Sequence, residues 1–444
     1  METKMEKKRR FSESITLKAV VVGLLILILL IPGAMVQDLI YERQERSEET
    51  IARINEKWSS AQTLCGPILS IPYTSVKYTK AKERIEEKNV LNLTPSDLKV
   101  NVVLFPEERH FGIYKTILYK SQIEISGEFE KRDFHNSNEL IYHLDGAYIT
   151  LGVSDLRGVT ENLNFVLNGK NYSTASTGSS DYAIGKGLII NVNDPEALRQ
   201  GTDLKFDCKL SLNGSSDINF IPIGKTTEVL VEGDWNSPGY IGNFSPEHLP
   251  AEKGFKAQWK ILSFNRGIPE TWVNNYDDSF WESSFGVSLV NPIDHYQQNM
   301  RSAKYAIMFI GLTFILFFFV EVITKKRIHP IQYLLVGIAL ILFYSLLLSI
   351  SEQIGFMGAY LMASGATIVL ITLYAYSIFK SKTHTAALTF ILGLLYLFLY
   401  VVLQLEDIAL LIGSVGLFVI LAVIMYFSRK ISWYKQEELP EEGQ

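Results

Sequence analysis

Five apolar runs follow one another almost without interruption in the C-terminal third of the chain, separated by only a few polar residues. Each is long enough to cross the roughly 30 Å of hydrocarbon in a bilayer, which needs about 20 residues of helix. Helix is also the structure that satisfies the backbone groups of a single segment at that depth. We therefore predict a five-helix membrane block over residues 303–428, with spans at about 305–323, 331–350, 356–379, 385–405 and 408–427.

A further apolar run, residues 15–37, follows a basic tail of residues 1–14. It is longer than the roughly 7–15 residues typical of a signal-peptide core, and no clear A-x-A site follows it. This pattern favours a permanent first transmembrane helix over a cleaved signal peptide, which is the alternative. The chain then has six spans.

Charges between the runs predict the orientation of these spans. Basic residues follow the first, third and fifth C-terminal runs. The loops after the second and fourth runs carry acidic residues and no Lys or Arg. The positive-inside rule places the basic loops, the N-terminal tail and residues 429–444 in the cytoplasm. Arg301 and Lys304 oppose this assignment but are outnumbered. The basic residues are Lys325, Lys326, Arg327, Lys380, Lys382, Arg429, Lys430 and Lys435.

Residues 38–302 then form one large outer segment. A helix is predicted over residues 41–60, where Ile51, Ile54 and Trp58 have the spacing of one helical face. Beyond it, apolar and polar residues alternate at 123–130, 204–212 and 255–261, as in antiparallel strands with one buried face. Shorter strands are predicted at 98–105, 148–153, 163–168, 187–192 and 227–232, and a mobile loop at 173–181.

The predicted fold class is therefore an α+β membrane protein. Six transmembrane helices, one N-terminal and five C-terminal, carry a large β-rich outer domain inserted after the first. That domain is predicted to be a sandwich or a layered meander.

Composition and motifs mainly exclude classes of function. A formal net charge of −5 over 444 residues, without a basic stripe, argues against nucleic-acid binding. The seven histidines show no metal-binding spacing, and no G-x-S-x-G sequence is present. We therefore expect no catalytic constellation, metal or cofactor. Cys65 and Cys208 both face an oxidising compartment in the predicted topology, so a disulfide and two buried thiols both stay open.

Polar residues in or beside the spans are the first set of candidate functional residues, because charge in a membrane is costly. One interpretation is a polar site or ion path between helices. The other is structural: Glu321 pairs with Lys325 near the cytoplasmic surface, and the remaining acids mark outer loops. Broken helices repeated in two halves, common in transporters, are absent from the sequence, which favours the structural interpretation. The set is Glu321, Gln332, Glu352, Gln404, Glu406 and Asp407.

Arginine and aromatic residues of the outer domain form the second set. They predict either a binding surface or core aromatics with buried salt-bridge partners. The residues are Arg109, Tyr114, Arg157, Trp235, Trp259 and Arg266.

Several short motifs together resemble those of the CreD family, the inner-membrane cell envelope integrity proteins of bacteria. The resemblance runs from about residue 12 to Tyr434 and rests on the order and spacing of the motifs. They include Trp58-x-x-x-Gln62-x-x-x-Gly66-Pro67, Arg109-x-x-Gly112-Ile113-Tyr114, Ser154-Asp155-x-Arg157-Gly158, Asp234-Trp235-x-x-Pro238, Gly254-Phe255-x-Ala257-x-Trp259, His329-Pro330-Ile331-Gln332-Tyr333, Ser351-Glu352-x-Ile354-Gly355-Phe356 and Leu403-Gln404-Leu405-Glu406-Asp407. The chain departs from the family at Cys65 and in the polar loop 173–181.

The resemblance implies a bacterial inner-membrane protein with a periplasmic domain. It also implies a link to an envelope-stress response, colicin tolerance and the response to β-lactams, but it carries no catalytic residues. We therefore predict a non-enzymatic protein that contacts the lipid bilayer and binds an envelope protein or cell-wall component through its periplasmic domain. The alternatives are a transporter or lipid-handling protein using Glu321, Gln332 and Gln404, and, with less support, a hydrolase near Glu352, Glu406 and Asp407. The oligomeric state stays open.

Overall fold

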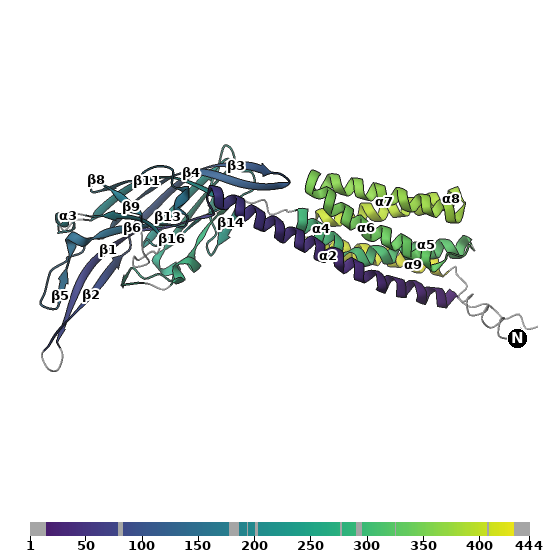
Figure 1. Cartoon of the computed structure of the whole chain (residues 1–444), viewed down its shortest axis with the longest axis horizontal. Helices are drawn as coiled ribbons and strands as arrows, with labels where there is room; N and C mark the ends of the chain where they lie inside the picture. The colour runs from purple at the N-terminus through teal and green to yellow at the C-terminus, as the bar shows by residue number, and fades with distance from the viewer. Residues whose placement is uncertain are drawn as a thin grey trace, which may run out of the picture. The chain divides into compact units, whose positions relative to one another are not determined.

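The computed structural model describes residues 15–78, 83–176, 186–192, 194–199, 203–275, 278–289, 295–324, 326–405 and 408–429. The chain divides into two compact units. One comprises Met1–Arg46 and Ile293–Gln444 and is helical; the other, Ser47–Pro292, is rich in strands (Figure 1).

The helical unit is built from long apolar helices. Five of the described helices, α2 and α5 to α8, are long and apolar enough to cross a membrane, and α9 contains a shorter apolar stretch, Leu411–Tyr426. The predicted fold class, an α+β membrane protein with one N-terminal helix and a C-terminal helix block, is confirmed. The bounds are α2 Ile15–Trp58, α4 His295–Lys304, α5 Ala306–Thr324, α6 Pro330–Ile354, α7 Phe356–Phe379, α8 Lys382–Gln404 and α9 Ala409–Ser428.

Local sequence explains where these helices begin and end. His329 caps α6, Pro330 follows in the first turn where its missing N–H is not needed, and the Gln332 side chain completes a capping box. Gly355, with φ of +79°, separates α6 from α7. Lys380 ends α7 in a left-handed conformation. These short connections turn each helix back along its predecessor.

The strand-rich unit consists of two sheets. The first has the order β14-β18-β12-β1-β6-β10-β9, with β2, β5 and β17 attached to its side; the second has the order β15-β16-β13-β3-β4-β11-β7-β8. The strands are β1 Gln62–Tyr78, β2 Arg84–Leu93, β3 Asp97–Phe111, β4 Tyr114–Phe129, β5 Leu140–Tyr142, β6 Tyr148–Val153, β7 Asn164–Leu167, β8 Lys170–Tyr172, β9 Thr174–Ser176, β10 Gly187–Asn191, β11 Leu204–Ser215, β12 Asp217–Phe220, β13 Thr226–Gly233, β14 Gly239–Gly242, β15 Glu247–His248, β16 Phe255–Leu262, β17 Thr271–Val273 and β18 Phe285–Ser288; a short helix, α3, covers Pro195–Arg199.

The two sheets share one apolar core, as in a sandwich. Along β11 every second residue from Leu204 to Leu212 is buried, and the same holds from Phe255 to Ile261 in β16. Trp259 of β16 meets Phe285 of β18 across the sheets, with ring centroids 5.4 Å apart. The predicted period-two segments therefore form this core.

Three features differ from the sequence-based prediction. The central strand β1 covers Gln62–Tyr78, a stretch in which no strand was predicted. Two strand pairs are parallel, β1 with β12 and β13 with β3, within sheets expected to be antiparallel. Residues 174–176, expected in a loop, form the edge strand β9 on β10, because backbone pairing needs no apolar side chains at an edge; residues 177–181 lie outside the described residues.

Candidate functional site

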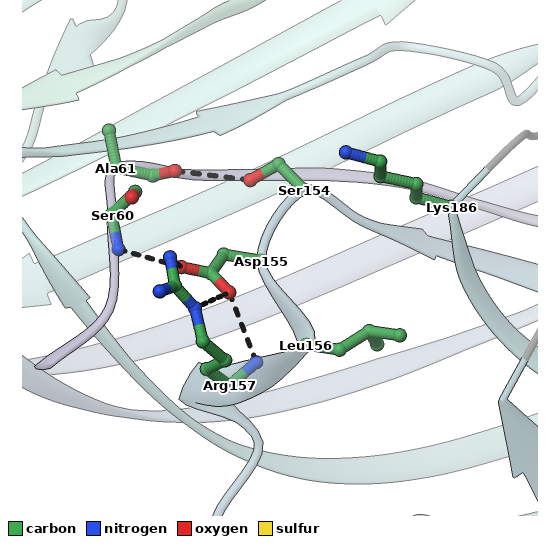
Figure 2. A pocket seen from close by; sticks show the side chains of 7 residues that line it. All are labelled: Ser60, Ala61, Ser154, Asp155, Leu156, Arg157 and Lys186. Carbon is green, nitrogen blue, oxygen red and sulfur yellow. Dashed lines mark hydrogen bonds and ion pairs between the residues drawn. The ribbon is translucent and has the colours of Figure 1, made fainter. Parts of the chain in front are cut away.

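A cavity of about 460 Å³ lies in the strand-rich unit, where the chain passes from α2 into β1. Residues from three separate segments line it: the two residues preceding β1, the turn after β6 and the residue preceding β10. Figure 2 shows the lining side chains, which are Ser60, Ala61, Ser154, Asp155, Leu156, Arg157 and Lys186. We call this cavity the junction pocket.

Asp155 is the electrostatic centre of the junction pocket. Its carboxylate accepts hydrogen bonds from the backbone N–H of Ser60 at 3.0 Å, and from the Nε and Nη2 of Arg157 at 2.9 and 2.8 Å. The side-chain hydrogen bonds from Arg157 hold the pKa of Asp155 far below its usual range, although burial opposes them. Asp155 is therefore ionised, and its hydrogen bonds hold the Arg157 guanidinium in place over the pocket.

A buried amide ties two of the lining segments of the pocket, those before β1 and after β6, to each other and to β11. The Gln62 Nε2 donates to Ser59 Oγ at 2.7 Å and to the backbone carbonyls of Asp155 and Asn213, each at 3.0 Å. Gly158 must be glycine here, since a Cβ would lie 2.2 Å from the Asn213 carbonyl oxygen and 2.5 Å from Gln62 Nε2. The Trp58–Gln62 and Ser154–Gly158 motifs, far apart in sequence, therefore build one site.

The mouth of the junction pocket is basic. The Arg157 side chain is 59% exposed, so the guanidinium N–H groups that do not reach Asp155 face solvent. Lys186 is exposed as well, and it forms no ion pair with any residue that the structure describes. Among the lining residues, Arg157 and Lys186 carry two positive charges against the single negative charge of Asp155, and Glu56 adds a negative charge within electrostatic range of Arg157. The pocket is therefore suited to an anionic group.

The other predicted surface residues do not gather at this pocket. Arg109 and Tyr114 lie in the β3–β4 hairpin, where the Arg109 guanidinium stacks over Trp58 with 5.2 Å to the ring centroid. Trp235 is half-buried against the core. Arg266 is only 7% exposed, and it donates from Nη1 to the Ile268 carbonyl at 3.0 Å. Burial lowers the pKa of Arg266 to about 10.

The two cysteines are also placed in the interior. Cys65 and Cys208 are free and buried, in β1 and β11 respectively. Burial raises the pKa of each thiol to about 12. Of the two arrangements left open by the sequence, the structure has two buried thiols.

In the helical unit, Glu321 is at the centre of a buried polar cluster. The carboxylate pairs with Lys18 of α2, and it accepts hydrogen bonds from Tyr333 Oη and from the Ile328 backbone N–H, each at 3.0 Å. Its predicted partner Lys325 lies outside the described residues. We call this the Glu321 cluster.

Glu352 is at the centre of a second cluster. Arg43 of α2 donates from Nε at 2.8 Å and from Nη2 at 2.6 Å, so the pair is bidentate, and Tyr296 Oη donates at 3.0 Å. The Glu352 side chain is only 7% exposed. This is the Glu352 cluster, and it joins α2, α4 and α6.

Gln332 lies in the first turn of α6, one residue before Tyr333 of the Glu321 cluster, whereas Gln404 is at the far end of α8. Gln332 caps α6 by accepting the His329 backbone N–H at 2.9 Å. Gln404 is the last residue of α8 and is exposed. This end of α8 lies at the opposite end of the bundle from the start of α6. Glu406 and Asp407 lie outside the described residues. The three residues required by the transport alternative therefore do not form one site.

Comparison with known proteins agrees with this architecture. Residues 14–434 match the family described as "Inner membrane protein CreD". The chain is also 32% identical over 415 residues to the "Inner membrane protein CreD" of Escherichia coli (strain K12), covering 92% of this chain and 91% of that protein. The chain belongs to the CreD family. It is accordingly a multi-pass protein of the inner membrane, in contact with the lipid bilayer.

Several residues of this CreD protein's sites were missed by sequence reasoning. Lys18 and Arg43 flank the apolar part of α2. Basic residues are usual beside a membrane span, so their presence there does not by itself indicate a functional site. Lys186 is the central residue of a Gly-Lys-Gly sequence that runs into a strand, and this pattern matches no binding motif in the sequence. Among the described residues, no three His, Cys, Asp or Glu side chains gather as a metal site would require.

Proposed function

We propose that this CreD protein is a non-enzymatic support of the cell envelope, and that its strand-rich domain is periplasmic and binds an envelope component. The junction pocket, with Arg157 and Lys186 at its mouth, is the observation that carries the proposal. The proposed process is the one that the family resemblance implies: tolerance of bacteriocins and of agents that attack the cell wall.

The chemistry of the pocket favours binding over catalysis. Asp155 already accepts from Ser60 and Arg157, so it is poorly placed to act as a base toward the neighbouring hydroxyls. A fixed guanidinium and a nearby ammonium instead recognise a carboxylate or phosphate, because each supplies charge-assisted N–H donors. The proposed ligand is therefore an anionic group of an envelope protein or of the cell wall.

Site-specific photo-crosslinking in intact cells tests this proposal. A photoreactive amino acid replaces Leu156, which lines the pocket, and in a matched control it replaces Phe105, which is 52% exposed on β3. We expect crosslinks to a defined envelope component from position 156 but not from 105, and at least a fivefold loss in the R157Q/K186Q background. Equal crosslinking from both positions, or no effect of removing the two charges, would refute the proposal.

The proposed orientation has its own test. Reversing the charges of Lys325, Lys326 and Arg327 removes much of the local positive-inside signal. We expect reporter fusions placed after residue 327 to lose their cytoplasmic signature in this variant. An unchanged reporter pattern would contradict the assignment of these loops to the cytoplasm.

A further inference from the structure

An apolar cavity of about 140 Å³ opens among α5, α8 and α9, and none of its lining residues belongs to either carboxylate cluster. Its walls are Tyr305 and Met308 at the start of α5, Phe398 and Val402 on α8, and Gly413 and Leu417 on α9. We call it the α9 groove. Leu399 and Ser414 complete the lining, in which the Tyr305 and Ser414 hydroxyls are the polar side-chain groups.

The groove is open beside α9 because two of the three α9 residues that line it, Gly413 and Ser414, are small. Gly413 has no Cβ, and a Cβ built there would meet nothing within 4 Å. Its neighbour Ser414 points its hydroxyl back to the Leu411 carbonyl at 2.9 Å, so it presents no unsatisfied donor to the groove. The space beside α9 is therefore open and apolar, and Ser414 leaves no unsatisfied hydrogen-bond donor in it. Such a space suits a hydrocarbon chain.

A basic residue is the chain neighbour of the groove residue Tyr305. Lys304, the last residue of α4, precedes the groove residue Tyr305 in the chain and is exposed. Its ammonium forms no ion pair with the described residues. A lysine at the end of a membrane helix extends its ammonium toward the headgroup region, where phosphate is the abundant anion.

We propose that the α9 groove binds one membrane phospholipid, with an acyl chain along Gly413 and the phosphate at Lys304. An apolar groove on a bilayer-embedded bundle is surrounded by acyl chains, and the adjoining cation complements a phosphate. This site is separate from the junction pocket, and its occupancy does not depend on the proposed envelope ligand.

Native mass spectrometry of the full chain, extracted in mild detergent, tests the site. We expect the wild-type protein to retain one phospholipid, and G413L to reduce retention at least tenfold by filling the groove. The matched control is G365L: a Cβ at Gly365 also meets nothing within 4 Å, but that residue is exposed on α7 and outside the groove. Retention by G413L at the level of G365L, or no retained lipid in the wild type, would overturn the proposal.

A second measurement tests the headgroup contact. Phosphatidylethanolamine, phosphatidylglycerol and diacylglycerol are each added to delipidated protein. We expect the two phospholipids to bind at least fivefold more tightly than diacylglycerol, which has no phosphate, and K304E to abolish that preference. Equal binding of all three lipids by the wild type, or an unchanged preference in K304E, would refute the phosphate contact at Lys304.

Discussion

The bidentate pair between Arg43 and Glu352 should be a major attachment of α2 to the helical bundle. Removing one member of a buried ion pair costs about 3–5 kcal/mol, because the other charge is left without a partner. Exposed pairs contribute only about 0–1 kcal/mol. The Glu352 side chain is 7% exposed and that of Arg43 is 32% exposed, so this pair lies between these limits. We expect R43A to lower the free energy of unfolding by about 2–3 kcal/mol.

A double-mutant cycle separates the pair from other effects of the substitution. E352Q should cost less than R43A, since the amide oxygen of the substituted side chain can still accept the Tyr296 hydroxyl hydrogen bond and the partly exposed Arg43 remains hydrated. The double variant should therefore be little worse than R43A alone. We expect a coupling energy of about 1–2 kcal/mol.

Unfolding by sodium dodecyl sulfate in mixed micelles, followed by far-UV circular dichroism, reports mainly on the helices. Five of the six tryptophans, Trp58, Trp235, Trp259, Trp272 and Trp281, lie in the strand-rich unit, so tryptophan fluorescence reports separately on that unit once Trp433 is replaced by phenylalanine in every variant. R43A should shift the first signal and leave the second nearly unchanged.

The matched control is the exposed pair of Arg46 and Glu42, one turn away on the same helix. Their side chains are 56% and 59% exposed, and we expect R46A to cost less than about 0.5 kcal/mol. A coupling energy for Arg43 and Glu352 no larger than that of this control pair would refute the reasoning.

Three further predictions concern the strand-rich unit. G158A should destabilise it by about 1–3 kcal/mol through overpacking, while G267A, where a Cβ meets nothing within 4 Å, should not; tryptophan-monitored unfolding compares them. The pKa of Asp155 is depressed in the folded state, so its carboxylate stabilises the folded state above about pH 4–5, and this stabilisation is lost as the pH falls through the folded-state pKa. D155N should therefore flatten the loss of stability in acid, as measured by unfolding curves at a series of pH values. Curves of unchanged shape would contradict this prediction. Cys65 and Cys208 should react with iodoacetamide at neutral pH only after unfolding, as counted by mass spectrometry, since burial raises both pKa values to about 12; rapid labelling of the native protein would be the contrary result.

Local patterns in the sequence were sufficient for much of this fold. Runs of about 20 apolar residues indicate membrane helices by themselves, and the alternation in β11 and β16 indicates strands, because both signals are complete within one segment. The central strand β1 lacks such a signal. It contains Pro67 and Pro72, and its long buried stretch does not alternate. Its position depends on neighbours from distant parts of the chain.

The candidate sites were harder to predict for the same reason. The partners Arg43 and Glu352 are separated by 309 positions, and Lys18 and Glu321 by 303. The junction pocket combines residues 60–61, 154–157 and 186. Sequence analysis identified Arg157, Glu321 and Glu352 from their residue type, but their partners are set by the tertiary fold.

The spacing of the two ion pairs, Lys18 with Glu321 and Arg43 with Glu352, indicates that they hold α2 against the bundle. Lys18 and Arg43 are 25 helical residues apart, or about 38 Å at 1.5 Å per residue, somewhat more than the roughly 30 Å of bilayer hydrocarbon. Tyr333 and Glu352 similarly lie near opposite ends of α6, about 29 Å apart by the same rise per residue. The charges thus fit the two boundaries of the hydrocarbon, where burying an ion pair costs less than at the centre. Since each carboxylate is already engaged by a cation from α2 and a tyrosine hydroxyl, the clusters fix α2 against the bundle and leave little capacity for carrying an ion between them.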